Sequence, residues 1–268
     1  DVRRDQGKLV FFDFRDMTGK VQGVVLPASP AMEIAKGIRD EFVVTVRGKI
    51  NERPEKNKQA DRLNGGVELE ILEITILNVA EPMPFDIHSD TREVNEEVRL
   101  KYRYLDLRSE RMQKNIRMRD KIISFFRDYM HRNNFVEIET PMLMKGTPEG
   151  SREYVVPSRL HAGKFYVLPQ SPQQFKQLSM VASFERYFQI ARCMRDEDQR
   201  GDRQPEFTQL DFEMSFVERE DILSYTEEMF IELVKKLYPE KKISETPFPR
   251  ITYKESIEKY GSDKPDLR

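Results

Sequence analysis

The first third of the chain alternates apolar and polar residues with the period of two that is typical of β-strands. The predicted strands are Lys8–Arg15, Val21–Leu26, Glu41–Ile50 and Val67–Val79. A short helix near Pro30–Lys36 and a polar loop over Asn51–Gly66 are expected between the later strands. Short strands joined by turns favour a small β-sandwich or β-barrel.

The pattern changes after Ala80–Asp90, a segment with two prolines and no periodicity that we interpret as a linker. From Ser109 to Asn133 apolar residues recur at helical spacing, which predicts one long amphipathic helix. Its expected apolar face is Met112, Ile116, Ile123, Phe126 and Met130. Arg99–Asn133 also holds eleven Lys and Arg residues against four Asp and Glu residues, which fits either a solvated helix face or an RNA-facing surface.

The last part of the chain mixes strand and helix patterns without βαβ alternation. The predicted strands are Tyr154–Val156, Phe165–Leu168, Tyr187–Cys193 and Phe207–Val217. A helix is predicted over Arg219–Leu237, with Met229, Leu233 and Leu237 on one face. This order predicts an antiparallel α+β domain.

Composition and charge narrow the class of protein. The 268 residues carry 45 Lys and Arg against 47 Asp and Glu, which excludes a globally basic nucleic-acid binder. The single Cys193 excludes an internal disulfide and favours a reducing compartment, most simply the cytoplasm. No apolar run approaches ~18 residues, so we expect no membrane span. The three histidines are not paired at zinc-ligand spacing, so we expect no metal held by side chains alone.

The strongest candidate for chemistry is a hairpin with a charged loop at Arg195–Pro205. Residues of one parity share a face of a strand, so Arg195 should lie beside Phe207, with Gln209, Asp211 and Glu213 further along. An arginine there can grip a phosphate, a phenylalanine can stack on a base, and carboxylates can bind an ammonium group or magnesium. From charge alone, a surface hairpin with ordinary ion pairs is the better explanation of the pattern.

The spacing of this hairpin resembles motif 2 of the class II aminoacyl-tRNA synthetases, on the residues Phe188, Arg195, Glu197, Arg203, Phe207 and Asp211. Phe135–Leu143, which follows the long helix, resembles motif 1, whose proline is Pro141 here. Further segments narrow the resemblance to the bacterial-type aspartyl-tRNA synthetases. They are Lys101–Arg108, Thr147–Gly150, Leu168–Lys176 and Tyr260–Arg268.

The resemblance implies a domain plan and a fold. Residues 1–79 correspond to an anticodon-binding OB-fold β-barrel, 80–98 to a linker, and 99–268 to the first part of an antiparallel-sheet catalytic domain with flanking helices. The family's third motif, which ends in an arginine for the ATP γ-phosphate, is not found in these residues. We therefore expect the chain to be a piece of a longer enzyme.

The resemblance also implies roles for individual residues. ATP, acting as a substrate with Mg²⁺, would meet Arg195, Glu197, Gln204 and Phe207, and the first two would be catalytic. L-Aspartate would meet Glu149, Ser171, Gln173, Lys176, Arg195 and Asp211. Lys176 would read the β-carboxylate of aspartate, because asparagine leaves that buried ammonium unpaired. Pro141 would lie at a homodimer interface.

The tRNA anticodon would meet Arg3, Arg4, Phe11 and Gln22 in the OB-fold domain. Phe11 could instead be a core residue, because it alternates with Phe12 and Phe14. Val24 stands where the family is usually aromatic. The leading hypothesis is an aspartate–tRNA ligase for tRNA(Asp), and one that also charges tRNA(Asn) fits equally well. A non-catalytic RNA-binding paralogue is the alternative, and a lysine- or asparagine-specific relative is disfavoured by the residues from Gln173 to Lys176.

Overall fold

The computed structural model describes residues 2–60, 63–147 and 149–267, so Pro148 of the Thr147–Gly150 motif lies outside the described residues. The chain divides into two compact units, Asp1–Tyr102 and Arg103–Arg268. Each unit is described by itself.

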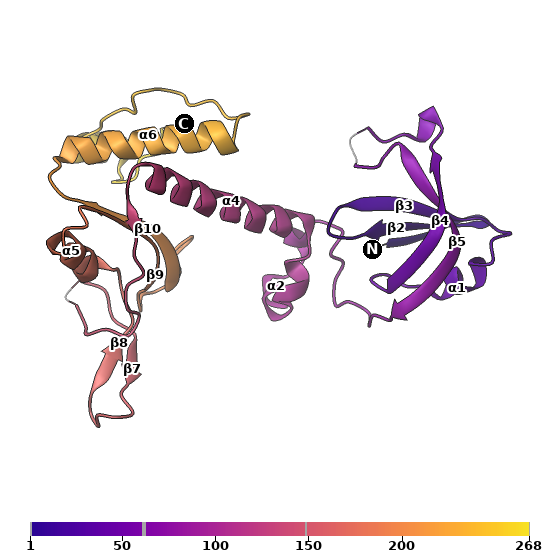
Figure 1. Cartoon of the computed structure of the whole chain (residues 1–268), viewed down its shortest axis with the longest axis horizontal. Coiled ribbons are helices and arrows are strands. Elements are labelled where there is room, and N and C mark those ends of the chain that lie inside the picture. The colour runs from indigo at the N-terminus through magenta and orange to yellow at the C-terminus, as the bar shows by residue number, and fades with distance from the viewer. Residues whose placement is uncertain (1, 61–62, 148, 268) are drawn as a thin grey trace. The chain divides into compact units, whose positions relative to one another are not determined.

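The N-terminal unit is built on a five-stranded sheet in the order β1-β2-β3-β5-β4 (Figure 1). Its strands are β1 (Val2–Gln6), β2 (Leu9–Arg15), β3 (Lys20–Val25), β4 (Val43–Glu52) and β5 (Val67–Asn78). All pairings are antiparallel except β3 with β5. The β1–β2 turn requires Gly7, whose φ of 65° lies in the left-handed region.

Helix α1 (Met32–Gly37) packs onto this sheet and completes its core. Val10 and Phe12 of β2 are buried with Ala35 of α1 and Ile71 of β5. Phe14 packs against the same core, so the even positions of β2 face inward. Phe11 therefore lies on the opposite face of the strand, as the RNA-facing hypothesis requires.

Short helices and irregular segments complete this unit. Residues 79–90 form neither helix nor strand. They lead to the 3₁₀ turn η2 (Thr91–Glu93) and to α2 (Glu96–Lys101), whose N-terminus is capped by the Asn95 side chain. A second 3₁₀ turn, η1 (Glu55–Asn57), lies in the polar loop.

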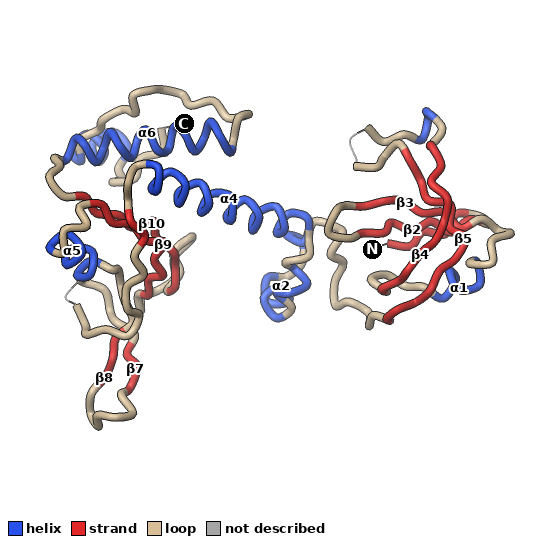
Figure 2. The backbone as a smooth tube through the Cα atoms, viewed as in Figure 1, coloured by secondary structure: helices blue, strands red, loops and turns tan. Residues whose placement is uncertain are grey.

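The C-terminal unit is a three-stranded sheet, β10-β9-β6, with helices around it (Figure 2). Its strands are β6 (Val136–Glu137), β7 (Val155–Pro157), β8 (Phe165–Val167), β9 (Arg186–Met194) and β10 (Glu206–Met214). Its helices are α3 (Arg103–Asp106), α4 (Glu110–Arg132), α5 (Gln173–Val181), α6 (Arg219–Leu237) and α7 (Tyr253–Tyr260). The strands β7 and β8 form a separate two-stranded hairpin.

The core of this unit lies between one face of the sheet and the helices α4 and α6. Phe125, Tyr129 and Met130 of α4 are buried against Met229 and Leu233 of α6. The sheet contributes the fully buried Phe188, with Leu210 and Phe212 packed against the cluster. The other face of the hairpin is left for polar groups.

The predicted α+β class is confirmed, with three corrections of detail. The sheet of the C-terminal unit is not wholly antiparallel, because β6 pairs with β9 in parallel after the long helix has brought the chain back. Strand β10 ends at Met214 rather than Val217, since Phe216 adopts a φ of 58° that no strand continues through. Ile116 of the expected apolar face is 51% exposed, whereas Met112 and Met130 of that face are buried, and Phe125 and Tyr129 are buried as well.

Candidate active site

The floor of the candidate site is the polar face of the β9–β10 hairpin. Its register pairs Phe207 with Cys193, Gln209 with Ala191, and Asp211 with Gln189. Side chains of one parity share a face, so Phe207, Gln209, Asp211 and Glu213 lie in one row. The intervening residues turn toward the core, as Leu210 and Phe212 do. The face predicted from the alternation is therefore formed.

Helix α5 places Lys176 over the far end of this floor. Its Nζ lies 3.2 Å from Oδ2 of Asp211 and 3.3 Å from Oε2 of Glu213. The side chains of Lys176 and Asp211 retain only 13% and 10% exposure, while Glu213 retains 32%. One ammonium between two carboxylates gives a nearly enclosed cluster with a net charge of −1. The role of Glu213 was not predicted, although its parity with Asp211 was visible in the sequence.

Asp211 is the most buried carboxylate in this cluster, and one of its oxygens has no partner. Burial raises the pKa of its carboxyl above the ordinary aspartate value, and the nearby Lys176 ammonium opposes that rise. Its Oδ1 atom is buried and has no hydrogen-bond partner. A buried acceptor without a donor is costly, so this oxygen is suited to receive an N–H group from a ligand. A substrate ammonium would supply one.

A third carboxylate, Glu149, is held near the start of α5. The Ser171 hydroxyl donates to Glu149 Oε2 at 2.7 Å, and the Thr147 hydroxyl donates to Glu149 Oε1 at 3.0 Å. Ser171 in turn accepts from the backbone N–H of Gln173 at 3.3 Å. The structure therefore joins Glu149, Ser171 and Gln173, three of the residues predicted for aspartate.

Arg195 begins the loop at the other end of the hairpin. Its guanidinium carbon lies 5.1 Å from the centre of the Phe207 ring, and its backbone N–H donates to Pro205 across the hairpin. Its Nε is buried without a hydrogen-bond partner. The predicted pairing of Arg195 with Phe207 is therefore formed, with an unused donor on the arginine.

A pocket of about 450 Å³ opens above this pair. Three cationic and three acidic side chains line it together with one amide and one ring: Arg195, Arg203, Lys264, Glu197, Asp198, Asp202, Gln204 and Phe207. Glu197 accepts a hydrogen bond from the Ser151 hydroxyl at 2.8 Å. All four residues predicted to meet ATP thus line one pocket. Lys264 was quoted in a motif but given no role, since only the fold brings it to this loop.

The strand β9 contributes Cys193 and Tyr187 to the same face, paired with Phe207 and Glu213, and these groups are polar but not reactive. Burial raises the pKa of the Cys193 thiol to about 11, and the thiol donates to Gln209 Oε1 at 3.2 Å. Burial also raises the pKa of Tyr187, whose hydroxyl donates to Gln189. A thiol that stays protonated is a poor nucleophile, so the chemistry rests on charge and position. Within the described residues no three His, Cys, Asp or Glu side chains could together hold a metal ion.

The N-terminal unit presents a second candidate surface. Arg4, Phe11 and Gln22 line a pocket of about 480 Å³ together with Asp5, Gln6 and Gln59. Arg4 donates to Asp13 at 2.8 Å and reaches Gln22 at 3.5 Å. The structure thus unites three of the four residues predicted for the anticodon. Gln59, from the polar loop, was not predicted, because its loop has no local pattern.

Arg3 lies apart from this pocket. Its guanidinium pairs with Asp5 at 2.7 Å and donates to the backbone carbonyls of Lys36 and Ile38. Strand alternation explains the difference, since neighbours in β1 point to opposite faces. Val24 lies in β3 and is 5% exposed, so it offers no exposed aromatic ring for stacking on a base.

Pro141 lies in an exposed segment between β6 and β7. Its neighbours Met142 and Leu143 are 37% and 53% exposed. Over the part of the chain that the structure describes, no helix is long and apolar enough to cross a membrane.

Comparison with known families agrees with this geometry. Residues 95–268 match the family of class II tRNA synthetases (D, K and N), and residues 1–77 match the OB-fold nucleic acid binding domain. The chain belongs to the class II tRNA synthetases of this D, K and N group. The family expected from the motifs is therefore confirmed.

Curated relatives point to one branch of that family. The chain is 52% identical over 270 residues to a protein of Syntrophomonas wolfei named aspartate–tRNA(Asp/Asn) ligase, covering 100% of this chain and 46% of that protein. A Bacillus subtilis protein of the same name is 50% identical over 268 residues, covering 99% of this chain and 45% of the relative. The chain thus spans less than half the length of these relatives.

Solved structures share the fold at lower identity. Entamoeba histolytica asparaginyl-tRNA synthetase superposes with a TM-score of 0.78 at 25% identity, over 96% of this chain and 60% of that one. The aspartyl-tRNA synthetase of the same organism gives a TM-score of 0.74 at 24% identity, over 96% of this chain and 57% of that one. These likenesses support the arrangement of elements described above.

Proposed function

We propose that this chain carries the aspartate- and ATP-binding part of an aspartate–tRNA ligase. The observation that carries the proposal is the Lys176 ammonium held between Asp211 and Glu213 on the hairpin floor. A nearly buried ammonium suits a ligand with a side-chain carboxylate and disfavours the neutral amide. The relatives' shared name supports the same substrate.

The proposed reaction has two steps. An α-carboxylate oxygen of L-aspartate attacks the α-phosphorus of ATP, the bond to pyrophosphate breaks, and aspartyl-adenylate forms. A ribose hydroxyl at the 3′ end of tRNA then attacks the aspartyl carbonyl, and AMP leaves. No protein nucleophile is needed, so the side chains position and stabilise charge.

The proposed roles of the side chains divide between the two ends of the hairpin floor, with the nucleotide at the Arg195 end and aspartate at the Lys176 end. Arg195 would grip the α-phosphate and the α-carboxylate, since its Nε is an unused donor beside the Phe207 ring. Phe207 would stack on adenine, while Gln204 and Glu197 contact the nucleotide. Asp211 would receive the substrate ammonium, with Ser171, Gln173 and Glu149 beside it. Lys176 would pair with the β-carboxylate.

A Mg²⁺ ion would depend on the nucleotide more than on the protein. The described side chains form no metal cage of three His, Cys, Asp or Glu residues. Magnesium commonly binds through substrate phosphates with one or two carboxylates, and Glu197, Asp198 and Asp202 line the pocket where those phosphates would lie. When bound, the ion would neutralise charge on the phosphates.

The N-terminal unit would bind the anticodon loop of tRNA(Asp). Phe11 can stack on a base, and Arg4 and Gln22 can hydrogen-bond base edges or phosphate. Arg3 would stabilise β1 and would contact the RNA backbone only at the edge of the pocket. The relatives' names include both tRNA(Asp) and tRNA(Asn), so we propose that either tRNA is a candidate substrate.

The remaining proposals concern organisation. We propose the division 1–79, 80–98 and 99–268 as OB-fold domain, linker and first part of the catalytic domain. The exposed Pro141–Leu143 segment supports a homodimer contact. A tRNA-charging activity operates where translation takes place, which supports a cytoplasmic location.

The test is binding of a sulfamoyl analogue of aspartyl-adenylate to the 268-residue chain, measured by isothermal titration calorimetry. We expect the aspartyl analogue to bind at least about 100-fold more tightly than the asparaginyl analogue. The variant Arg195→Ala should weaken binding by about 100-fold or more. The matched variant Arg192→Ala, on the other face of β9 and 70% exposed, should leave binding unchanged.

Two outcomes would contradict the proposal. Equal affinity for both analogues would show that the pocket does not read the β-carboxylate. Binding of anticodon RNA without any binding of either analogue would favour the non-catalytic RNA-binding protein instead.

A further inference from the structure

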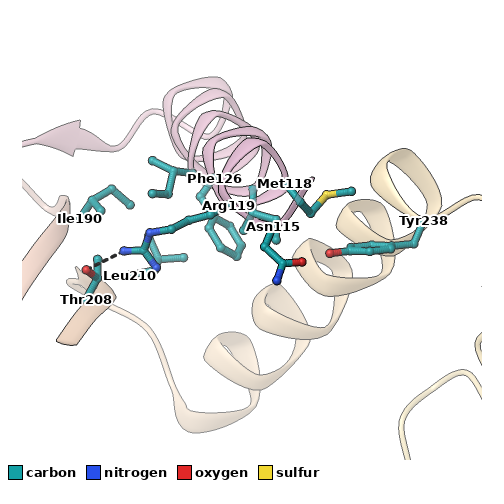
Figure 3. A pocket seen from close by; sticks show the side chains of 10 residues that line it. Asn115, Met118, Arg119, Phe126, Ile190, Thr208, Leu210 and Tyr238 are labelled. Carbon is teal, nitrogen blue, oxygen red and sulfur yellow. Dashed lines mark hydrogen bonds between the residues drawn. The ribbon is translucent and has the colours of Figure 1, made fainter. Parts of the chain in front are cut away.

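The opposite face of the hairpin, away from the candidate active site, carries a pocket of about 410 Å³ in the C-terminal unit (Figure 3). It lies between α4, the strands β9 and β10, and the residue after α6. None of the residues assigned above to aspartate or ATP lines it. A volume near the lower end of the usual range for ligand pockets fits a small molecule.

The walls of this pocket are apolar. Six apolar side chains from three elements line it: Met118, Ile122, Ile123, Phe126, Ile190 and Leu210. On α4 they recur at the spacing of one helix face, which is why the helix forms a continuous wall. They stay only partly buried, so a ligand that covers them would remove apolar surface from water.

The polar groups at the pocket favour an anion. None of the lining residues is acidic, and Arg119 is the single charged one. Its guanidinium donates to the Thr208 hydroxyl at 2.8 Å, as Figure 3 shows, and no carboxylate of the described residues is paired with it. The nearby Glu206 is occupied by Arg192 at 2.8 Å. An arginine with only a neutral partner retains donors for a bidentate carboxylate.

We propose that this pocket binds a small amphiphilic carboxylate, a molecule with one anionic head and an aliphatic or aromatic body. The head pairs with Arg119, and the body fills the space between α4 and the strands. Asn115 and Tyr238 line the same pocket and offer further hydrogen bonds to the ligand.

The test uses 3-phenylpropionate as the probe and its amide as a neutral match of the same shape. Titration of the 268-residue chain, followed by methyl NMR of isoleucine, leucine and methionine, reports both affinity and location. We expect saturable binding that shifts the methyl signals of Ile122, Ile123 and Leu210. The amide should bind about 10-fold more weakly or worse, since it lacks the charge-assisted contact.

Variants on one helix sharpen the test. Arg119→Met keeps the side-chain stem and should weaken the acid by about 10-fold or more, down to the affinity of the amide. Arg117→Met, exposed and outside the pocket, should leave both affinities unchanged. Equal binding of acid and amide to the unaltered chain would overturn the proposal. An absence of saturable binding, or an equal loss in both variants, would overturn it as well.

Discussion

Replacing Lys176 by methionine removes the ammonium between Asp211 and Glu213 while keeping an unbranched side chain of similar length. A unit-charge pair at the observed 3.2 Å interacts by about 5 kcal/mol at an effective dielectric constant of ~20, before desolvation is counted. Removing one partner of a buried ion pair usually costs about 3–5 kcal/mol. Glu213 is 32% exposed and can turn to water, so we expect a loss of about 2–3 kcal/mol in the free energy of unfolding.

The same substitution should damage substrate selection more than nucleotide binding. The two remaining carboxylates would face the β-carboxylate of aspartate, so affinity for the aspartyl analogue should fall by about 100-fold, while ATP binding changes little. Urea denaturation measures the first effect, and calorimetric titration measures the second. Lys235→Met, an exposed lysine in the last turn of α6, is the matched control and should change neither quantity.

A double variant separates the two effects. Adding Asp211→Asn to Lys176→Met removes the buried like charges, so stability should partly recover while aspartate affinity stays low. The reasoning would be refuted if Lys176→Met lost less than about 0.5 kcal/mol and bound both analogues like the unaltered chain. Such a result would place Lys176 among ordinary solvated lysines.

Further outcomes are expected at other positions. Since burial raises the pKa of Asp211, its carboxyl takes up a proton at higher pH than an ordinary aspartate, so aspartate affinity should fall earlier on acidification; Asp211→Asn should flatten that pH profile in calorimetric titrations. Phe11→Ala should weaken binding of an anticodon stem-loop by about 10-fold in fluorescence anisotropy, while Met17→Ala, 97% exposed, should not. Phe188→Ala should lower the free energy of unfolding by about 3–5 kcal/mol in urea, because the ring is fully buried. Leu143→Glu should weaken any self-association detected by analytical ultracentrifugation, and unchanged sedimentation would remove this segment from the interface.

Sequence periodicity was sufficient for elements whose burial is one-sided. The α6 helix and the parity of the β9–β10 hairpin follow directly from it, because each buries a single face against one neighbour. The same reasoning failed for Ile116, which is exposed although Met112, one turn earlier on the same helix, is buried. The periodicity of apolar residues predicts which face of a helix is apolar, but not how much of that face another element covers.

Contacts between residues that are far apart in the chain could not be predicted from the sequence. Lys176 and Glu213 meet only because α5 lies over β10. Lys264 reaches the nucleotide pocket from a segment about sixty residues further along the chain than the hairpin loop, as the fold alone shows. Arg3 and Arg4 could not be distinguished from the sequence, because they are adjacent residues of the same type. In the structure Arg3 donates a hydrogen bond to the backbone of Lys36, whereas Arg4 lines the pocket of the N-terminal unit.

The β10 strand of the hairpin floor also fixes the distance between the two proposed binding positions. Phe207 and Asp211 stand four residues apart on one face of a single strand, so the rise of about 3.3 Å per residue separates the two binding positions by about 13 Å. One inserted residue would turn the distal row over to the core, and two would keep the row but lengthen the gap by about 7 Å. An insertion in the loop between the strands, by contrast, would reshape the nucleotide pocket without changing the spacing between the two substrates.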